Sequence, residues 1–197
     1  MKSLATFAAF LALGVSAWAS SAPVPRAAKE FDFVEPNGKH TLLSSYKGKV
    51  VVIQFLLTTC PHCQAMSRDV LTKLQTELGP KGFQALGVVY NDPDPGSRVT
   101  KPEMAQNYFA EFRLNFPIAY ASRETILSFI GASVMDRLMF PHVVVVDKKG
   151  QIRAQSDVSG TAQLQNLDYL KNLVTDLQKE GASSAAPKKA VTTAANK

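Results

Sequence analysis

Residues 50–57 form a continuous apolar run interrupted only by Gln54, and the run is rich in β-branched residues. Such a pattern is typical of a central strand that is covered on both faces of a sheet. Shortly after it, Cys60 and Cys63 open a segment whose apolar residues recur with a helical period until Gly79. A buried strand therefore delivers two cysteines to the start of a helix, which predicts an α/β protein.

The rest of the central region alternates between strand patterns and helix patterns, separated by turn residues. Strands are predicted at residues 31–34, 40–43, 83–90, 116–120, 143–146 and 151–155. Helices are predicted from residue 100, with an apolar stripe of Met104, Tyr108, Phe109 and Phe112, and at residues 123–130 and 162–179. The expected fold is a central mixed β-sheet flanked by helices, with an N-terminal β-hairpin and an inserted helix.

The two ends of the chain differ in composition from its centre. Residues 1–19 combine Lys2, an apolar stretch and the small-x-small pattern at 17–19, which predicts a cleaved secretory signal peptide. An uncleaved N-terminal anchor is the alternative. Residues 28–180 have the length of one domain, whereas the Ala/Lys-rich residues 181–197 offer little apolar surface and are predicted to be a disordered tail. We therefore expect a periplasmic or secreted protein that is not stably inserted in the membrane after cleavage.

The charge balance excludes few partners but argues against one class. The chain has 22 Lys and Arg against 16 Asp and Glu, a formal net charge of +6. The basic residues do not cluster with aromatic residues, so nucleic-acid binding is not expected.

The two cysteines are the only ones in the chain, and they are too close together to close a stabilising loop. Their spacing instead suits disulfide exchange. Cys60 lies at the predicted helix N-terminus, where unpaired N–H groups stabilise a thiolate, so it should attack first. Cys63, one turn inward, should resolve the mixed disulfide. Pro61 suits a first turn, and a charged His62 would favour the thiolate.

The motifs resemble a known family. A Gly-Lys-Val-Val-Val opening leads into the Cys60-Pro61-His62-Cys63 tetrapeptide, and residues 141–150 read Pro-His-Val-Val-Val-Val-Asp-Lys-Lys-Gly. Together they resemble the periplasmic thioredoxin-like thiol-disulfide oxidoreductases of the TlpA/ResA type, which adjoin the wider redoxin group. The resemblance covers about residues 31–177.

The resemblance implies a thioredoxin-like fold and several site roles. Pro141 would be a cis-proline that packs against the dithiol, and Phe140 would offer its backbone to a bound substrate strand. His142, directly after it, would face the dithiol neighbourhood, or else only pack. The resemblance implies no cofactor other than the Cys60/Cys63 disulfide itself. The expected partners are exported cysteine-containing proteins and a membrane redox partner. The protein itself is expected to be a monomer.

Three departures from the family concern the direction of electron flow. The family usually has a Trp shortly before the first cysteine, and this chain has none there. Gln54 stands where thioredoxins bury an acidic residue, and Met66 stands where the reducing branch often has Glu. A neutral Gln54 cannot take the proton of Cys63. These differences favour an oxidising couple.

Other functions have weaker support in the sequence. A zinc site through the cysteines and nearby histidines lacks the second cysteine pair that structural zinc sites normally use. A peroxiredoxin-like peroxidase would need Thr at position 57, where this chain has Leu. A copper-binding redox chaperone could use both cysteines and a methionine such as Met66, Met135 or Met139, although such methionines are more often core residues.

Overall fold

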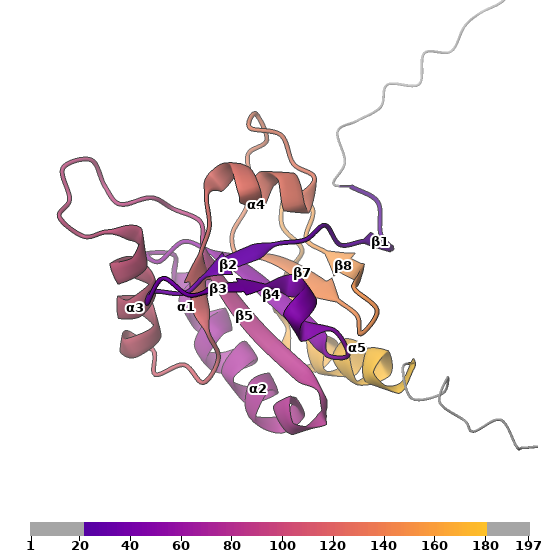
Figure 1. Ribbon diagram of the computed structural model, residues 1–197. Helices are drawn as coiled ribbons and strands as arrows, with labels where there is room; N and C mark the ends of the chain where they lie inside the picture. Colours follow the sequence, from indigo (N-terminus) through magenta and orange to yellow (C-terminus); the bar gives the residue numbers. More distant parts are fainter. Residues whose placement is uncertain (1–21, 181–197) are drawn as a thin grey trace, which may run out of the picture.

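The computed structural model describes residues 22–180, which are built around an eight-stranded mixed sheet (Figure 1). The sheet order is β1-β8-β7-β4-β5-β6-β2-β3. Strand β4 is central, parallel to β5 on one side and antiparallel to β7 on the other. The strands are β1 (Arg26–Ala27), β2 (Asp32–Val34), β3 (His40–Leu42), β4 (Val50–Leu56), β5 (Phe83–Val89), β6 (Ile118–Tyr120), β7 (His142–Val146) and β8 (Gln151–Gln155).

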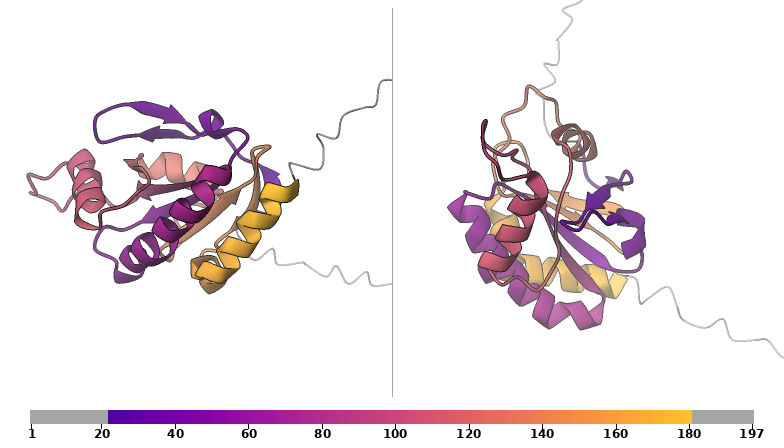
Figure 2. Two further views of the ribbon diagram at one scale, coloured as in Figure 1. Left: turned by 90° about the horizontal axis from the view of Figure 1, so that it is seen from below. Right: turned by 60° about the vertical axis from the view of Figure 1, so that its left-hand side comes forward.

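The helices cover both faces of this sheet. They are α1 (Pro61–Ala65), α2 (Thr72–Leu78), α3 (Lys101–Glu111), α4 (Arg123–Ile130) and α5 (Leu167–Glu180), with short 3-10 turns at Leu43–Tyr46, Gly79–Lys81 and Ala162–Gln165. Figure 2 shows α2 and α5 on one side of the sheet and the β2–β3 hairpin on the other. The α/β class, the N-terminal hairpin and the inserted helix α3 agree with the prediction.

The two faces of β4 divide the core. Val50, Val52 and Leu56 join the cluster under α1, α2, α3 and α5, which also contains Cys63. Val51, Ile53 and Phe55 join the cluster under α4 and the hairpin. All seven residues of β4 are buried, Gln54 included, as the apolar run predicted for a strand covered on both faces. The strand is therefore a rigid base for the loop that follows it.

The helix after the cysteines is not regular. Between α1 and α2, residues Met66–Leu71 form a π-helical turn, in which the amide of Thr72 donates to the carbonyl of Ser67 five residues earlier. π-Helical turns occur frequently at functional sites. The apolar period alone does not reveal this extra residue in the turn, because the buried positions Met66 and Val70 still face the sheet.

Three details of the sequence prediction were wrong. The final helix is split at Asn166, whose extended backbone ends the first turn and whose Oδ1 accepts from the amide of Tyr169 at 3.0 Å. Phe109 is 37% exposed, because it lies off the face of α3 that packs on the sheet. Strand β6 starts at Ile118, after Pro117, and not at residue 116.

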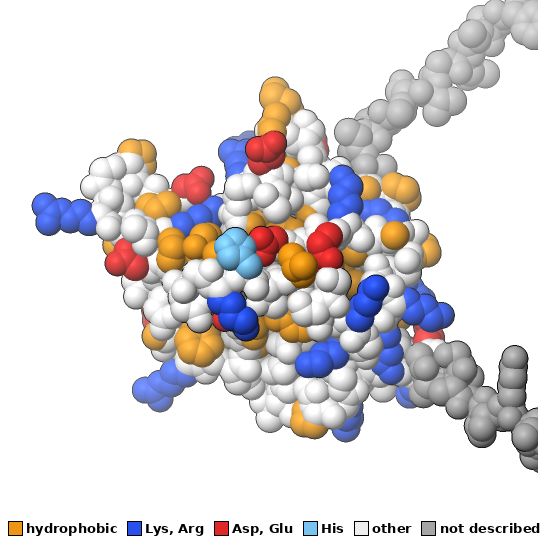
Figure 3. Space-filling model, in the orientation of Figure 1, with side chains coloured by type: hydrophobic (Ala, Val, Ile, Leu, Met, Phe, Trp, Pro, Cys, Tyr) orange, Lys and Arg blue, Asp and Glu red, His pale blue; other side chains and the backbone are white. Residues whose placement is uncertain are grey.

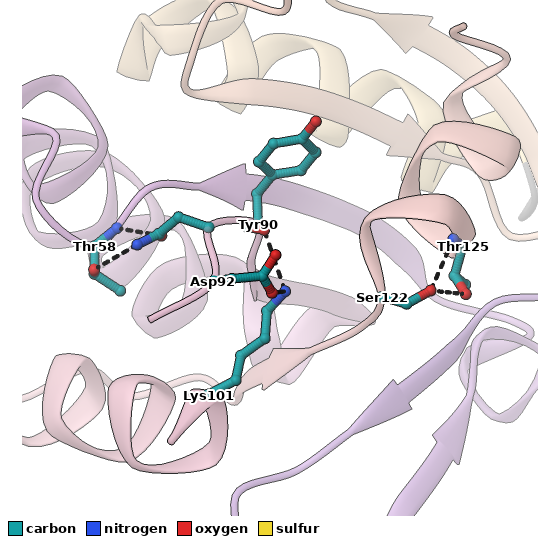
Figure 4. Close-up of polar contacts among 7 residues, drawn as sticks. Thr58, Tyr90, Asp92, Lys101, Ser122 and Thr125 are labelled. Atoms are coloured by element: carbon teal, nitrogen blue, oxygen red, sulfur yellow. Dashed lines mark hydrogen bonds and ion pairs between the residues drawn. The ribbon is translucent and has the colours of Figure 1, made fainter. Parts of the chain in front are cut away.

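Strand β1 was not predicted, since its two residues carry no periodic pattern. The helix starts were predicted better. Thr100 and Glu103 form the expected capping box on α3, and the hydroxyl of Ser122 accepts from the amide of Thr125 at the start of α4 (Figure 4).

The predicted signal peptide, residues 1–19, and the predicted tail, residues 181–197, lie outside the described residues. Among residues 22–180, no helix combines the length and the apolar character needed to cross a membrane.

Candidate functional site: the Cys60–Cys63 dithiol

The two cysteines lie at the carboxyl end of β4 in different environments. Cys60 is the N-cap residue of α1 and is partly exposed, whereas Cys63 lies inside the helix and is fully buried. Both are free thiols. Burial raises the pKa of the Cys63 thiol well above its ordinary value, and a hydrogen bond from the backbone of Leu57 only partly offsets this effect. One sulfur is therefore accessible and the other is protected.

The loop before β7 meets the accessible sulfur. The Cys60 thiol lies 3.9 Å from the carbonyl oxygen of Phe140, within the range of a weak S–H···O hydrogen bond. The Phe140–Pro141 peptide bond is cis, as the family resemblance implied, and Pro141 is buried. The structure thus brings Cys60 next to the carbonyl of the Phe140–Pro141 peptide bond, although Cys60 and Phe140 are 80 residues apart in the chain.

An aromatic pair lies beside this loop. The rings of Tyr90 and Phe140 are 4.7 Å apart between centroids and tilted by 45°. The guanidinium carbon of Arg123 lies 5.7 Å from the centre of the Tyr90 ring, a cation–π distance. Sequence reasoning missed Tyr90 and Arg123 as members of the site. Their position at the carboxyl end of β5 and the start of α4 was the available signal.

Hydrogen bonds from the inserted segment hold the loop that carries Cys60 (Figure 4). The amide of Thr58 donates to Oδ1 of Asn91 at 3.1 Å, and the Asn91 amide group reaches back to the Thr58 hydroxyl at 3.4 Å. Lys101, at the start of α3, donates to the Tyr90 carbonyl at 3.2 Å and to Asp92 at 2.9 Å. The loop after β5 is thereby tied both to the cysteine loop and to α3.

Gln54 lies directly behind the dithiol and is fully buried. Its amide nitrogen donates to the carbonyl oxygen of Cys63 at 2.9 Å. Its amide oxygen accepts from the hydroxyl of Ser67 at 2.7 Å. The side chain that replaces the family's buried acid thus contacts the backbone of the second cysteine.

The structure corrects the placement of His142. Its side chain is 1% exposed and packs against Phe55, with ring centroids 6.5 Å apart. Residues alternate between the faces of a strand, so His142 shares the face of Val144, opposite the face that holds Val143 and Cys63. The ring therefore cannot touch a substrate at the dithiol. Burial lowers its pKa to about 4.

Pro61 and His62 are exposed in the first turn of α1. A pocket of about 300 Å³ lies between α3 and the loop that precedes Cys60. Thr59, Met104 and Glu111 are among the residues that line it. The surroundings of Cys60 therefore offer both a peptide carbonyl and open space to an incoming chain.

The residues considered for a metal site lie in different places: Met66 shares the core cluster of Cys63, whereas His142 packs against Phe55 on the opposite face of the sheet. Within residues 22–180, no three His, Cys, Asp or Glu side chains are arranged to hold a metal ion. Met66 is 2% exposed in the core, whereas Met135 is 88% exposed and Met139 is 53% exposed. Figure 3 shows hydrophobic side chains at the tip of the loop that follows α4.

Comparison with known proteins places these features in context. The family model described as Redoxin matches residues 20–174. A Xenopus laevis protein named "Probable glutathione peroxidase 8-B" is 28% identical over 91 residues, which are 45% of this chain and 42% of that protein. The chain thus spans about two fifths of the length of that relative.

Solved structures share the fold at low identity. A thioredoxin family thiol:disulfide interchange protein from Chlorobium tepidum has a TM-score of 0.63 at 22% identity, covering 80% of this chain and 99% of that one. A thiol:disulfide interchange protein from a Bacteroides species has a TM-score of 0.61 at 19% identity, covering 82% and 93%. The predicted thioredoxin-like fold is confirmed.

Proposed function

The chain belongs to the Redoxin family and is an oxidoreductase, and from this premise we propose that it exchanges disulfides with cysteine-containing proteins through Cys60 and Cys63. The observation that carries the proposal is the contrast between the two sulfurs. Cys60 is partly exposed, whereas Cys63 is fully buried one turn behind it. A substrate disulfide can therefore reach Cys60 but not Cys63.

The chemistry follows from this contrast. The Cys60 thiolate attacks a substrate disulfide, which forms a Cys60–substrate bond and releases one substrate thiolate. Cys63 loses its proton to solvent and attacks Cys60, which breaks the mixed disulfide and releases the second substrate thiolate. Two substrate sulfurs are reduced and two protein sulfurs are oxidised. The same steps run backwards when the Cys60–Cys63 disulfide oxidises a substrate dithiol.

The surface around Cys60 supports a protein substrate. The Phe140 carbonyl lies beside the thiol and can accept a hydrogen bond from the backbone of an extended chain. The Tyr90 ring packs on Phe140 and provides apolar contact area next to it. The predicted signal peptide, residues 1–19, supports a periplasmic or secreted location, and with it exported cysteine-containing proteins as substrates and a membrane redox partner.

The proposal is tested with the reduced protein and a peptide that contains one disulfide. We expect two peptide thiols to appear for each protein oxidised, and mass spectrometry should find the Cys60–Cys63 disulfide in the product. A protein alkylated at the accessible Cys60 is the control and should release none. Disulfide exchange would be excluded if the reduced protein released no peptide thiols and the oxidised protein also failed to convert the dithiol form of the peptide to its disulfide.

We further propose that the couple is oxidising. His62 lies in the first turn of α1, where a positive imidazolium favours a neighbouring thiolate and hence the reduced form. Gln54 is neutral where an acid would disfavour that thiolate. The reduction potential should therefore lie above the value of about −270 mV of thioredoxin. His62→Pro should lower it. Equilibration with glutathione measures both, and a wild-type value at or below that of thioredoxin contradicts the proposal.

Peroxide reduction is the second candidate function. It is favoured by the similarity to the glutathione peroxidase relative, while Leu57 stands where peroxiredoxins have Thr. Comparing the rates at which the reduced protein consumes hydrogen peroxide and a peptide disulfide distinguishes the two functions. A faster reaction with the peptide disulfide supports exchange.

A further inference from the structure

A chain of polar groups crosses the core behind the dithiol. It joins the Cys63 carbonyl, the Gln54 amide, the Ser67 hydroxyl and the Tyr108 hydroxyl, with successive distances of 2.9, 2.7 and 2.9 Å. Gln54 and Ser67 are fully buried and Tyr108 is 2% exposed. The three side chains come from β4, the π-helical turn and α3. The inserted helix is thereby connected to the backbone of the second cysteine.

The direction of every bond in this chain is fixed. The Cys63 carbonyl can only accept, so Gln54 must present its nitrogen to Cys63 and its oxygen to Ser67. The amide oxygen of Gln54 can only accept, so Ser67 must donate its single hydroxyl hydrogen to it. The remaining contact then requires the Tyr108 hydroxyl to donate to Ser67. A single orientation satisfies all three bonds.

The π-helical turn gives Ser67 its place in this chain. The amide of Thr72 reaches five residues back to the carbonyl of Ser67, and the Thr72 hydroxyl donates to the same oxygen at 3.0 Å. The backbone of Ser67 is thus held from one side and its hydroxyl from the other. Buried polar groups of this kind are costly to leave unpaired. The network therefore specifies one position for α1, the helical turn that carries Cys63 and directly precedes the π-helical turn.

This position matters because Cys63 reacts while buried. Its thiol must become a thiolate and approach the Cys60 sulfur within the first turn of the helix. If that turn were displaced, the Cys63 sulfur would no longer be aligned with the Cys60–substrate bond that it must break. The pKa of the Tyr108 hydroxyl is raised, chiefly by burial and further by the charges of the two cysteines. Tyr108 therefore stays protonated and continues to donate when Cys63 ionises.

We propose that Tyr108 is a positioning residue for the resolving step, acting through Ser67 and Gln54 on the turn that carries Cys63. This inference rests on the proposed function, in which Cys63 breaks the mixed disulfide formed at Cys60. Attack by Cys60 does not involve the network, because Cys60 has its own contacts with Leu57 and Phe140. Tyr108 should therefore affect resolution and leave attack unchanged.

Tyr108→Phe removes only the donor and keeps the ring. We expect the mixed disulfide with a peptide substrate to resolve about five- to tenfold more slowly, the equivalent of one lost hydrogen bond. The rate of Cys60 alkylation by iodoacetamide should stay within about twofold, since the first step is untouched. Tyr46→Phe, on the other face of the sheet, is the matched control and should change neither rate.

A second variant tests whether the effect passes through Ser67. Ser67→Ala should slow resolution at least as much as Tyr108→Phe, and the double variant should be no slower than Ser67→Ala alone, because the chain is already broken. Additive effects, a wild-type resolution rate in Tyr108→Phe, or equal slowing of alkylation and resolution would each overturn the positioning role. Absence of any mixed disulfide in wild type would instead refute the proposed function.

Discussion

Cys63→Ala should turn the protein into a trap that holds its substrates through Cys60, because the second attack is then impossible. Incubated with disulfide-bonded peptide, the variant should accumulate one covalent peptide per chain, whereas wild type should release both peptide thiols. Turnover should fall to background. Non-reducing electrophoresis and mass spectrometry of the adduct identify the trapping residue.

Cys60→Ala is the matched variant and should neither trap nor turn over. Its remaining sulfur has no exposed surface and burial raises its thiol pKa, so few thiolates form and none can be reached. An adduct on Cys63 in this variant, or the same amount of adduct in both variants, would show that the roles assigned to the two cysteines are wrong.

The wild-type protein should lose stability on mild acidification because of His142. Burial lowers the pKa of this ring from 6.5 to about 4, while Asp157 opposes the shift. The unfolded chain therefore takes up a proton below pH 6.5 that the folded chain takes up only near pH 4. The free energy of unfolding is therefore unaffected by protonation of His142 above pH 6.5. It falls as the pH drops from 6.5 toward 4, by on the order of 3 kcal/mol.

Urea unfolding at pH 7 and pH 4 measures this loss. His142→Leu and His142→Gln should each remove it, because neither side chain titrates, and the acidic residues common to all variants cancel in the comparison. Removing the two ring nitrogens, which have no hydrogen-bond partner among residues 22–180, should leave the leucine variant no less stable at pH 4 than wild type. His62→Gln, at an exposed position, should keep the wild-type pH dependence. The same acid loss in all four proteins would contradict the argument.

The sequence predicted the frame of the site because its signals are local. The apolar run of β4, the capping box of α3 and the glycine that ends α4 each act within a few residues. The cysteine pair directly after β4 needed no tertiary information either. The association of Phe140 and Pro141 with Cys60 came from the family resemblance, and no local pattern would have supplied it.

The parts that were missed depend on contacts between distant elements. The helical period correctly gave Tyr108 an inward position, but its hydroxyl partner lies 41 residues away on another helix. Tyr90 joins the site only because the loop before β7 brings Phe140 against it. For His142, nearness to Pro141 in sequence left both a position beside the dithiol and a purely packing role open, and the alternation of strand residues turns it to the opposite face.

The two edges of the sheet have a bearing on aggregation. The outermost strands, β1 and β3, have two and three residues, so each leaves few backbone groups free to pair with another chain. Under the proposed function, the protein would meet extended substrate chains that could add to a free edge. Short edges disfavour such pairing, so a substrate chain that pairs with the Phe140 carbonyl beside Cys60 would react and leave instead of extending the sheet into an aggregate.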